Sequence, residues 1–282
     1  MDAPIDLKAW LGRSETRSDA ITAAPLVALA ATLDREDPPP ASGSAVPPLW
    51  HWLYFLPMAR QSELGADGHP RRGGFLPLVA LPRRMWAGGR LEFAKPLRVG
   101  EVATRRSTIA DIASKSARSG PLVFVTVHHE IATHGAVAVS EDHDIVYRDL
   151  PAPGSAAPPA PGAPRDETFA RTVVPDDVFL FRYSALTFNG HRIHYDRRYV
   201  TEVEGYPGLI VHGPLIATLL LDLLRREHAN AVVTRFEFKA VSPLFDLHPF
   251  EVCGRADGER RFALWARNHE GGLAMQASAE VA

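Results

Sequence analysis

The sequence has a single cysteine, no excess of charge of either sign and no long apolar run. Because Cys253 stands alone, an internal disulfide and a multi-cysteine metal site are excluded, and a reducing cytoplasm fits the chain. The 31 Lys and Arg residues face 33 Asp and Glu residues, so we expect no nucleic acid partner. The longest apolar stretch near the N-terminus, residues 20–33, is too short to cross a bilayer and predicts an amphipathic surface helix.

Residues 1–6 carry neither a basic start nor an apolar core before a cleavage site, so we expect no export and a cytoplasmic location. The 282 residues favour two domains of ordinary size. A hydrophobic content of 46% with 23% charged residues is typical of a globular protein and excludes a disordered or fibrous chain.

One segment differs from the rest by composition. Residues 151–164 consist of proline, alanine, glycine and one serine, so backbone donors are few and no large side chain is available to pack. Such a segment is typical of an extended linker. We therefore expect an N-terminal domain over residues 1–150, a linker over 151–167 and a C-terminal domain over 168–282.

Both halves predict a sheet and a helix. In the second half, residues 168–174, 231–241, 250–256, 261–268 and 272–281 read as antiparallel strands with glycine turns, and residues 214–224 form a helix so apolar that it must be buried. In the first half, residues 98–110, 122–134 and 136–147 alternate like strands, and residues 49–56 form a short, bulky helix candidate. The expected fold class is α+β, with two units that each curve an antiparallel sheet around one helix.

Reactive side chains are densest in residues 183–214, directly before the apolar helix. An isolated histidine usually satisfies a backbone carbonyl, but here the free amides and positive dipole end of a buried helix begin beside the loop. Gly213 has no Cβ, so a substrate oxygen that gains negative charge can approach its amide. His194, with an ordinary pKa near 6.5, can exchange a proton at neutral pH, as adding water to a double bond requires. The segment predicts a base facing an oxyanion hole.

The same residues resemble a known family. The run Phe-Asn-Gly-His-Arg-Ile-His-Tyr-Asp at 188–196 and the run Glu-Gly-Tyr-Pro-Gly-Leu-Ile-Val-His-Gly-Pro at 204–214 resemble the MaoC-like hydratases of the hot dog fold. Within that family they are most similar to the branch of mesaconyl-coenzyme A hydratases, itaconyl-coenzyme A hydratases and mitochondrial-type 3-hydroxyacyl-thioester dehydratases. The run Pro-Arg-Arg-Met-Trp-Ala-Gly-Gly at 82–89 also resembles this branch. The resemblance implies a double hot dog, with a catalytic second half and a first half that forms tunnel walls.

The resemblance also implies roles for single residues. His194 stands at the position of the catalytic histidine, Asn189 at that of an aspartate, and the Gly213 amide would bind the thioester oxygen. Asparagine can orient a water but cannot take a proton. Either His194 works alone through an ordered water, or Asp196 or Glu204 supplies the missing carboxylate.

The implied reaction is the reversible hydration of an enoyl thioester to a 3-hydroxyacyl thioester, with a short dicarboxylic acyl-coenzyme A such as mesaconyl- or itaconyl-coenzyme A as substrate. Arg83, Arg84 and Trp86 are candidates for contacts with a substrate carboxylate or phosphate. The other substrate-binding candidates are His191, Arg192, Tyr195, Tyr206 and His212. No metal or other cofactor is implied, and the assembly is either a monomer or a homodimer of fused pairs.

Three alternatives stay open at this stage. The substrate could be a longer 3-hydroxyacyl thioester of fatty acid metabolism, carried by coenzyme A or acyl carrier protein. His191, His194 and Asp196 could instead bind a metal, since imidazole and carboxylate suit zinc or iron. The protein could also bind acyl thioesters without turnover, because a fold does not fix a function.

Overall fold

The computed structural model describes residues 6–117, 120–150 and 159–282. The strands are β1 (Ser14–Ala20), β2 (Arg83–Phe93), β3 (Val102–Ala117), β4 (Gly120–Thr133), β5 (Ala136–Arg148), β6 (Phe169–Val173), β7 (Val233–Ala240), β8 (Phe250–Ala256), β9 (Arg261–Arg267) and β10 (Leu273–Val281). The α-helices are α1 (Ala23–Thr32), α2 (Asp177–Leu186), α3 (Arg197–Glu202) and α4 (Gly213–Glu227). Four short 3₁₀ helices are η1 (Leu7–Trp10), η2 (Trp50–Leu53), η3 (Gln61–Glu63) and η4 (Arg192–His194). None of the described helices is long and apolar enough to span a membrane.

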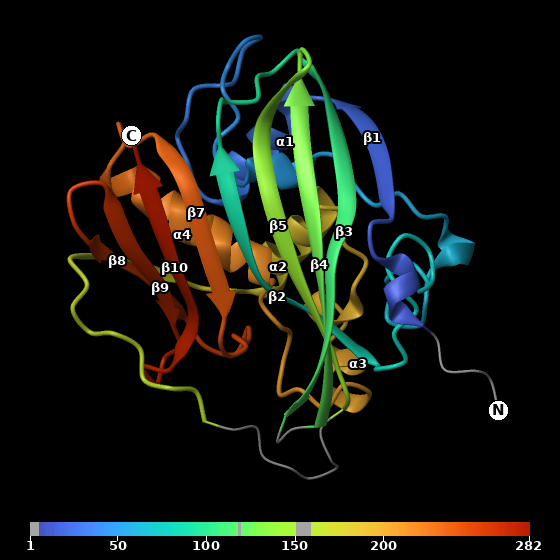
Figure 1. The fold of residues 1–282 in the computed structure, drawn as a ribbon. Helices are drawn as coiled ribbons and strands as arrows, with labels where there is room; N and C mark the ends of the chain where they lie inside the picture. Colours follow the sequence, from blue (N-terminus) through green and yellow to red (C-terminus); the bar gives the residue numbers. More distant parts are fainter. Residues whose placement is uncertain (1–5, 118–119, 151–158) are drawn as a thin grey trace, which may run out of the picture.

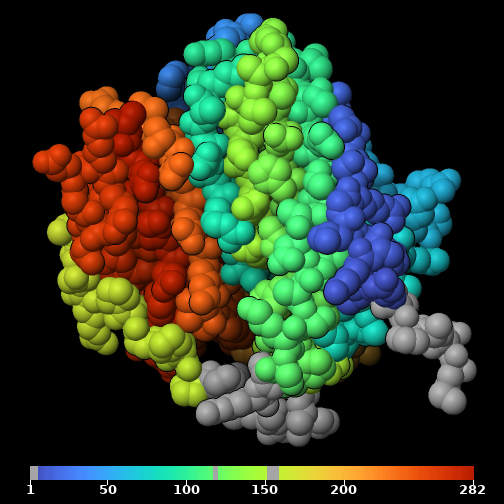
Figure 2. Space-filling view, in the orientation of Figure 1, coloured from blue at the N-terminus to red at the C-terminus, as the bar shows by residue number. Residues whose placement is uncertain are grey.

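The strands of the two halves form one continuous antiparallel sheet in the order β1-β3-β4-β5-β2-β7-β10-β9-β8-β6. The helices lie behind this sheet in the view of Figure 1. The halves meet where β2 pairs with β7, and in Figure 2 they lie side by side on this face of the molecule. This arrangement is a double hot dog, so the predicted α+β class and two-unit architecture are confirmed.

Two glycines make the junction between the half-sheets. Gly88 pairs with Lys239 and Gly89 with Phe238. A Cβ on Gly88 would lie 2.6 Å from the Phe238 carbonyl oxygen, and one on Gly89 would lie 2.8 Å from the Phe238 ring. Only glycine therefore lets β2 and β7 approach at this point.

The apolar helix of the second half is buried as predicted. Every residue of α4 from Leu215 to Leu224 is buried. Pro214 stands in its first turn, where a missing N–H costs nothing, and Arg225 and Arg226 stand in the last turn, where cations offset the helix dipole. The core of the second half is therefore built around α4.

The helix predicted over residues 49–56 is wrong. Only Trp50–Leu53 is helical, as the 3₁₀ turn η2, which follows Pro47 and Pro48. The amphipathic surface helix predicted within residues 20–33 is confirmed as α1, which buries Leu26 and Leu29 and exposes Val27. In the described part of the first half, no long helix packs against the sheet, so room remains on the side of the sheet where the helices lie.

The predicted strands all occur, with ends shifted by a few residues, but β1 and β2 were missed. Strand β1 is polar and mostly exposed, so it lacks an apolar alternation. The alternation of β2 is interrupted by Gly88 and by a register shift between Trp86 and Gly88. Of the predicted linker, residues 151–158 lie outside the described residues, and Ala163 donates its N–H to the Gly271 carbonyl at 2.9 Å beside the start of β10.

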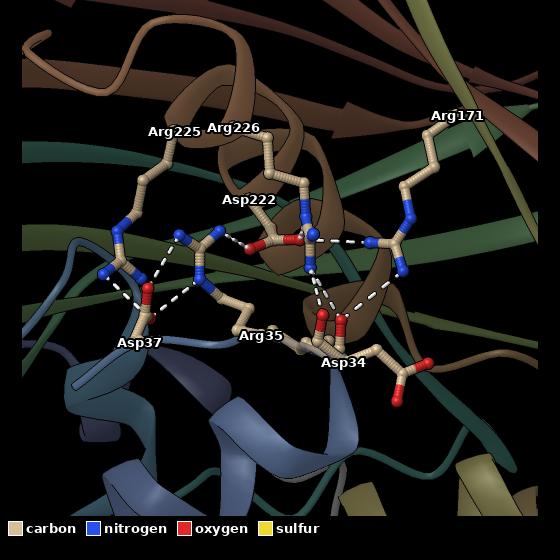
Figure 3. A network of polar contacts seen from close by, with 8 residues as sticks. Asp34, Arg35, Asp37, Arg171, Asp222, Arg225 and Arg226 are labelled. Atoms are coloured by element: carbon tan, nitrogen blue, oxygen red, sulfur yellow. Dashed lines mark hydrogen bonds and ion pairs between the residues drawn. The ribbon is translucent and has the colours of Figure 1, made fainter. Parts of the chain in front are cut away.

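A buried ion-pair network ties the far end of α4 to the first half (Figure 3). The Asp222 carboxylate, almost fully buried, accepts from Arg35 at 2.7 Å, Arg226 at 2.8 Å and Arg171 at 3.2 Å. Arg35 also pairs with Asp37 at 2.8 Å. Since Arg35 follows α1 and Arg171 lies on β6, this carboxylate links both halves.

Replacing Asp222 with alanine should lower the free energy of unfolding by about 3 kcal/mol, because the partly buried Arg171 and Arg226 lose their carboxylate and Arg35 keeps only Asp37. Urea unfolding followed by circular dichroism measures this difference. As a control, Glu92→Ala removes one side of the exposed Glu92–Arg235 pair and should change stability little. Equal stability of Asp222→Ala and Glu92→Ala would contradict the assigned role.

Candidate active site

A cavity of about 2060 Å³ lies between the two halves. The second half contributes His194 and Gly213 to its lining, and the first half contributes Trp86 and His143. Its volume exceeds the ~300–1,000 Å³ of ordinary ligand pockets. It can therefore hold a substrate with a long arm.

The loop after α2 presents the predicted catalytic residues. The Asn189 N–H donates to the Ser184 carbonyl at 2.8 Å, and the Asn189 Oδ1 accepts the His191 N–H at 3.0 Å. The turn η4 follows directly and carries His194 into the interior. Local hydrogen bonds thus hold both Asn189 and His194 at the cavity wall.

The His194 ring is poised to accept a proton. Its Nδ1 lies 2.7 Å from the Ile210 carbonyl oxygen, which can only accept, so Nδ1 carries the hydrogen and Nε2 has the free lone pair. Burial lowers the pKa of His194 to about 4, although the bond to Ile210 opposes this shift. The ring is therefore neutral, and a base, at pH 7.

The start of α4 presents an open amide. A Cβ built on Gly213 would meet only the Trp86 carbonyl oxygen, at 3.9 Å. The first backbone bond of the helix runs from the Ile216 N–H to His212, so the Gly213 N–H has no backbone acceptor among the described residues. Gly213 lines the cavity, and its amide can meet a substrate oxygen there.

His212 supports this corner from inside. Its Nε2 lies 2.8 Å from Ser184 Oγ, and its ring stacks on His194 with centroids 3.7 Å apart. Burial holds the pKa of His212 well below its usual value. His212 therefore packs as a neutral ring behind the base.

A histidine from the first half, which the sequence analysis missed, reaches the same place. The centroids of the His69 and His191 rings lie 4.0 Å apart, and those of the His191 and His194 rings lie 5.5 Å apart. With His212 the four rings form a column from the first-half segment 65–70 to the start of α4. The only local signal is Asp67-Gly68-His69-Pro70, a turn with a positive φ at Gly68.

Three other predicted binding residues are engaged within the protein. Arg192 pairs with Asp196 at 2.7 Å, and Tyr195 donates its hydroxyl to the Gly190 carbonyl at 2.8 Å. Arg83 pairs with Glu204 at 3.3 Å and lies over the ring of Tyr206, which lines the cavity. These contacts hold the walls of the site.

Arg84 and Trp86 lie differently. Arg84 lines the cavity, is half-buried and has no carboxylate within ion-pair distance in the described part of the chain. Trp86 stacks on His143 with centroids 3.7 Å apart and donates its Nε1–H to Gly88. Arg84 is thus a cation available to a ligand.

The two carboxylates weighed as substitutes for the family aspartate are used elsewhere. Asp196 caps α3 at the Tyr199 N–H and pairs with Arg192, whereas Glu204 pairs with Arg83 and accepts from the Tyr199 hydroxyl at 3.2 Å. The metal set His191, His194 and Asp196 is not brought together either. The set close enough to hold an ion among the described residues is Asp67, His69 and His191.

The first half gives the cavity a polar floor that the sequence analysis did not anticipate. Glu141 on β5 accepts from His51 Nε2 at 3.0 Å and from Trp52 Nε1 at 3.0 Å. Burial raises the pKa of Glu141, but the hydrogen bond from His51 and the charges of His51, His129 and His143 together lower it to about 2. The neighbouring His143 has its pKa lowered by burial to about 3 and is neutral.

Comparison with known proteins bears on this geometry. The chain is 50% identical to the mesaconyl-C(4)-CoA hydratase of Chloroflexus aurantiacus, over 98% of each chain. Its structure is similar to that of HtdX of Mycobacterium tuberculosis, with a TM-score of 0.68 at 18% identity, over 96% of this chain and 100% of that one. A second M. tuberculosis protein, described as having a double hotdog fold, matches with a TM-score of 0.59 at 14% identity, over 96% of each chain.

The model of the family "Hydroxyacyl-thioester dehydratase type 2" matches residues 49–246. This range contains both the polar floor of the first half and the His194 loop of the second. The chain therefore belongs to the hydroxyacyl-thioester dehydratase type 2 family, whose members are hydro-lyases, and it shares the MaoC-like hot dog architecture.

Proposed function

We propose that this enzyme reversibly hydrates the double bond of a short dicarboxylic enoyl-coenzyme A, such as mesaconyl- or itaconyl-coenzyme A. The observation that carries the proposal is the neutral, buried His194 with a free Nε2, set in the same cavity as the open Gly213 amide. The 50% identity to a mesaconyl-C(4)-CoA hydratase supports the choice of acyl group. A non-catalytic binder would need no such base.

The geometry supports a syn addition with one base. His194 Nε2 takes a proton from a water that Asn189 holds, and the water oxygen bonds to C3 of the enoyl group. The π electrons move toward the thioester oxygen, where the Gly213 N–H stabilises the enolate. The imidazolium of His194 then returns its proton to C2, so one water is added in total and the base is regenerated.

Arg84 offers a reason for a dicarboxylic substrate. A half-buried guanidinium without a carboxylate partner favours an anionic ligand, and a carboxylate can accept two parallel N–H bonds from it. The free carboxylate of a mesaconyl-type acyl group fits this requirement. The coenzyme A arm would occupy the remainder of the cavity.

A longer 3-hydroxyacyl thioester is the second candidate. The cavity of about 2060 Å³ has room for a longer chain, and the matching family is named for hydroxyacyl-thioester dehydratases.

Residues 168–282 carry the base and the oxyanion amide in this proposal, and residues 1–150 complete the substrate cavity. A cytoplasmic location, as a monomer or homodimer, completes the proposal.

His194→Ala should lower kcat by about a hundredfold to ten-thousandfold with little change in KM, because proton transfer is lost and binding is kept. Loss of enoyl-thioester absorbance measures the rate, and His269→Ala, at an exposed surface ring, serves as control. Since the working base is neutral, kcat/KM of the wild type should fall only as pH drops through about 4, the pKa of His194. Wild-type turnover in His194→Ala would exclude His194 as the base.

Gly213→Val should lower kcat by roughly a hundredfold to a thousandfold, because the branched side chain keeps the substrate oxygen away from the amide, which has the effect of losing an oxyanion donor. The protein should still fold, because a Cβ at this position meets only the Trp86 carbonyl oxygen, at 3.9 Å. Gly213→Ala, with a smaller side chain, should lose less. If folded Gly213→Val shows unchanged kinetics, the amide does not bind the thioester oxygen.

Arg84→Gln should lower kcat/KM for mesaconyl-C4-coenzyme A by roughly tenfold to a hundredfold, the effect of losing a hydrogen bond to a charged group. Crotonyl-coenzyme A has the same chain length without the carboxylate, so its kcat/KM should stay nearly unchanged. Equal losses on both substrates would contradict the assignment of Arg84. Higher wild-type kcat/KM for a long 3-hydroxyacyl thioester would favour the second candidate.

A further inference from the structure

The segment 65–70 of the first half docks onto the loop that carries His194. The Arg192 N–H donates to the Asp67 carbonyl at 2.9 Å, and the Arg192 guanidinium donates to the Ala66 carbonyl at 3.0 Å. A Cβ on Gly68 would lie 1.9 Å from the Gly190 carbonyl oxygen, and one on Gly190 would lie 2.7 Å from the Gly68 carbonyl oxygen. Two glycines thus bring the backbones of the two halves into direct contact.

This contact places a carboxylate–imidazole pair beside the catalytic loop. Asp67 Oδ2 lies 3.1 Å from His69 Nδ1, and Asp67 Oδ1 accepts the His69 N–H at 3.1 Å. The carboxylate fixes the hydrogen on Nδ1 and leaves Nε2 of His69 as an acceptor. His69 lines the cavity and packs on His191.

Asp67, His69 and His191 are close enough to hold a metal ion, but their orientation favours another role. An imidazole binds a metal in the plane of its ring, along the nitrogen lone pair. The His69 and His191 rings lie with centroids 4.0 Å apart and with their planes tilted at 39° to each other. Asp67 and His69 already satisfy each other without an ion.

We propose that Asp67 and His69 are positioning residues for His194, and that Asp67 supplies from the first half the carboxylate that the 189–196 loop lacks. This rests on the proposed hydratase function. When His194 takes the proton of the attacking water, its imidazolium is stabilised by the nearby negative charge of Asp67. His69 and His191 lie between the two groups and line the cavity.

Charged groups of both signs surround the pair. His69 is faced by Asp67, by the cations Arg84 and Arg72, and by the His191 ring. Burial lowers the pKa of His69, so the ring is neutral at pH 7. Burial raises the pKa of Asp67, but the hydrogen bond and charge of its partners hold it below its usual value. The pair therefore carries one negative charge while the reaction runs.

His194 is faced by three rings, those of His69, His191 and His212, and by no carboxylate of its own loop. The shift in its pKa includes repulsion from a proton on His69. A proton on one ring of the column therefore opposes a second. Asp67 lies at the end of the column opposite to α4.

The test is a rescue experiment. Asp67→Asn keeps the acceptor for the His69 N–H but removes the charge, so kcat should fall by about tenfold to a hundredfold while KM changes little. Asn189→Asp places a carboxylate in the loop itself, so the double variant Asp67→Asn/Asn189→Asp should recover most of the lost kcat. The matched control Glu63→Gln removes an exposed charge just before this segment and should leave kcat unchanged.

Two outcomes of the kinetics would overturn the proposal. Wild-type kcat in folded Asp67→Asn would show that the charge is not used, and a loss that Asn189→Asp does not restore would show a purely structural role. Activity that a chelator removes and zinc restores would also overturn it, in favour of a metal at Asp67, His69 and His191.

A measurement without substrate separates this proposal from the proposed function. Nitrogen-15 NMR of the wild-type histidines at neutral pH should show His69 neutral with its hydrogen on Nδ1. A His69 with its hydrogen on Nε2 would overturn the pair even if the enzyme hydrates every thioester offered. If the wild type turns over no enoyl thioester, the proposed function fails while the NMR result still decides whether the pair exists.

Discussion

The pairing of β2 with β7 is the constraint on which the rest of the structure depends. Gly88 and Gly89 let the two strands approach, and this joins two half-sheets into one. Strand β2 also places the Trp86 carbonyl oxygen 3.9 Å from the position that a Cβ on Gly213 would occupy. Arg84 precedes Trp86 on β2, so the pairing of β2 with β7 also fixes the position of Arg84 at the cavity wall. The pairing of β2 with β7 thus places the substrate contacts of the first half opposite the start of α4 in the second half.

The described residues of the first half form no helix as long as α4, and this makes the two units unequal. In the second half, α4 fills the space against its sheet with apolar side chains. In the first half, η2 is a single turn, and the inner sheet face carries Glu141 and His143 instead. A buried carboxylate is tolerated only where its charge is satisfied, and His51 and Trp52 do this for Glu141. On this face of the first-half sheet, polar side chains therefore line a cavity, whereas in the second half a helix packs against the sheet.

Sequence reasoning predicted what is encoded locally. The 189–196 run, the apolar helix after Gly213 and most strands follow from spacing and periodicity, and the structure confirms their placement. The sequence analysis could not find β2, because the glycines that let β2 pair with β7 also interrupt its alternation of apolar and polar residues. Nor could it find Asp67 and His69, whose contact with His191 exists only because two loops over a hundred residues apart meet through Gly68 and Gly190. The missing carboxylate was sought in the nearest sequence, but Asp196 and Glu204 already hold Arg192 and Arg83.

The electrostatics of the histidine column explain why a distant carboxylate suffices. Burial lowers the pKa of all four histidines, so the rings are neutral before the reaction begins and His194 can accept a proton. The same burial makes a transient positive charge costly, because no solvent can reorient around it. In such surroundings a single negative charge acts over a longer distance than it would in water. Asp67 lies two rings away from His194, beyond His69 and His191, and in our proposal its charge stabilises the imidazolium until the proton returns to C2.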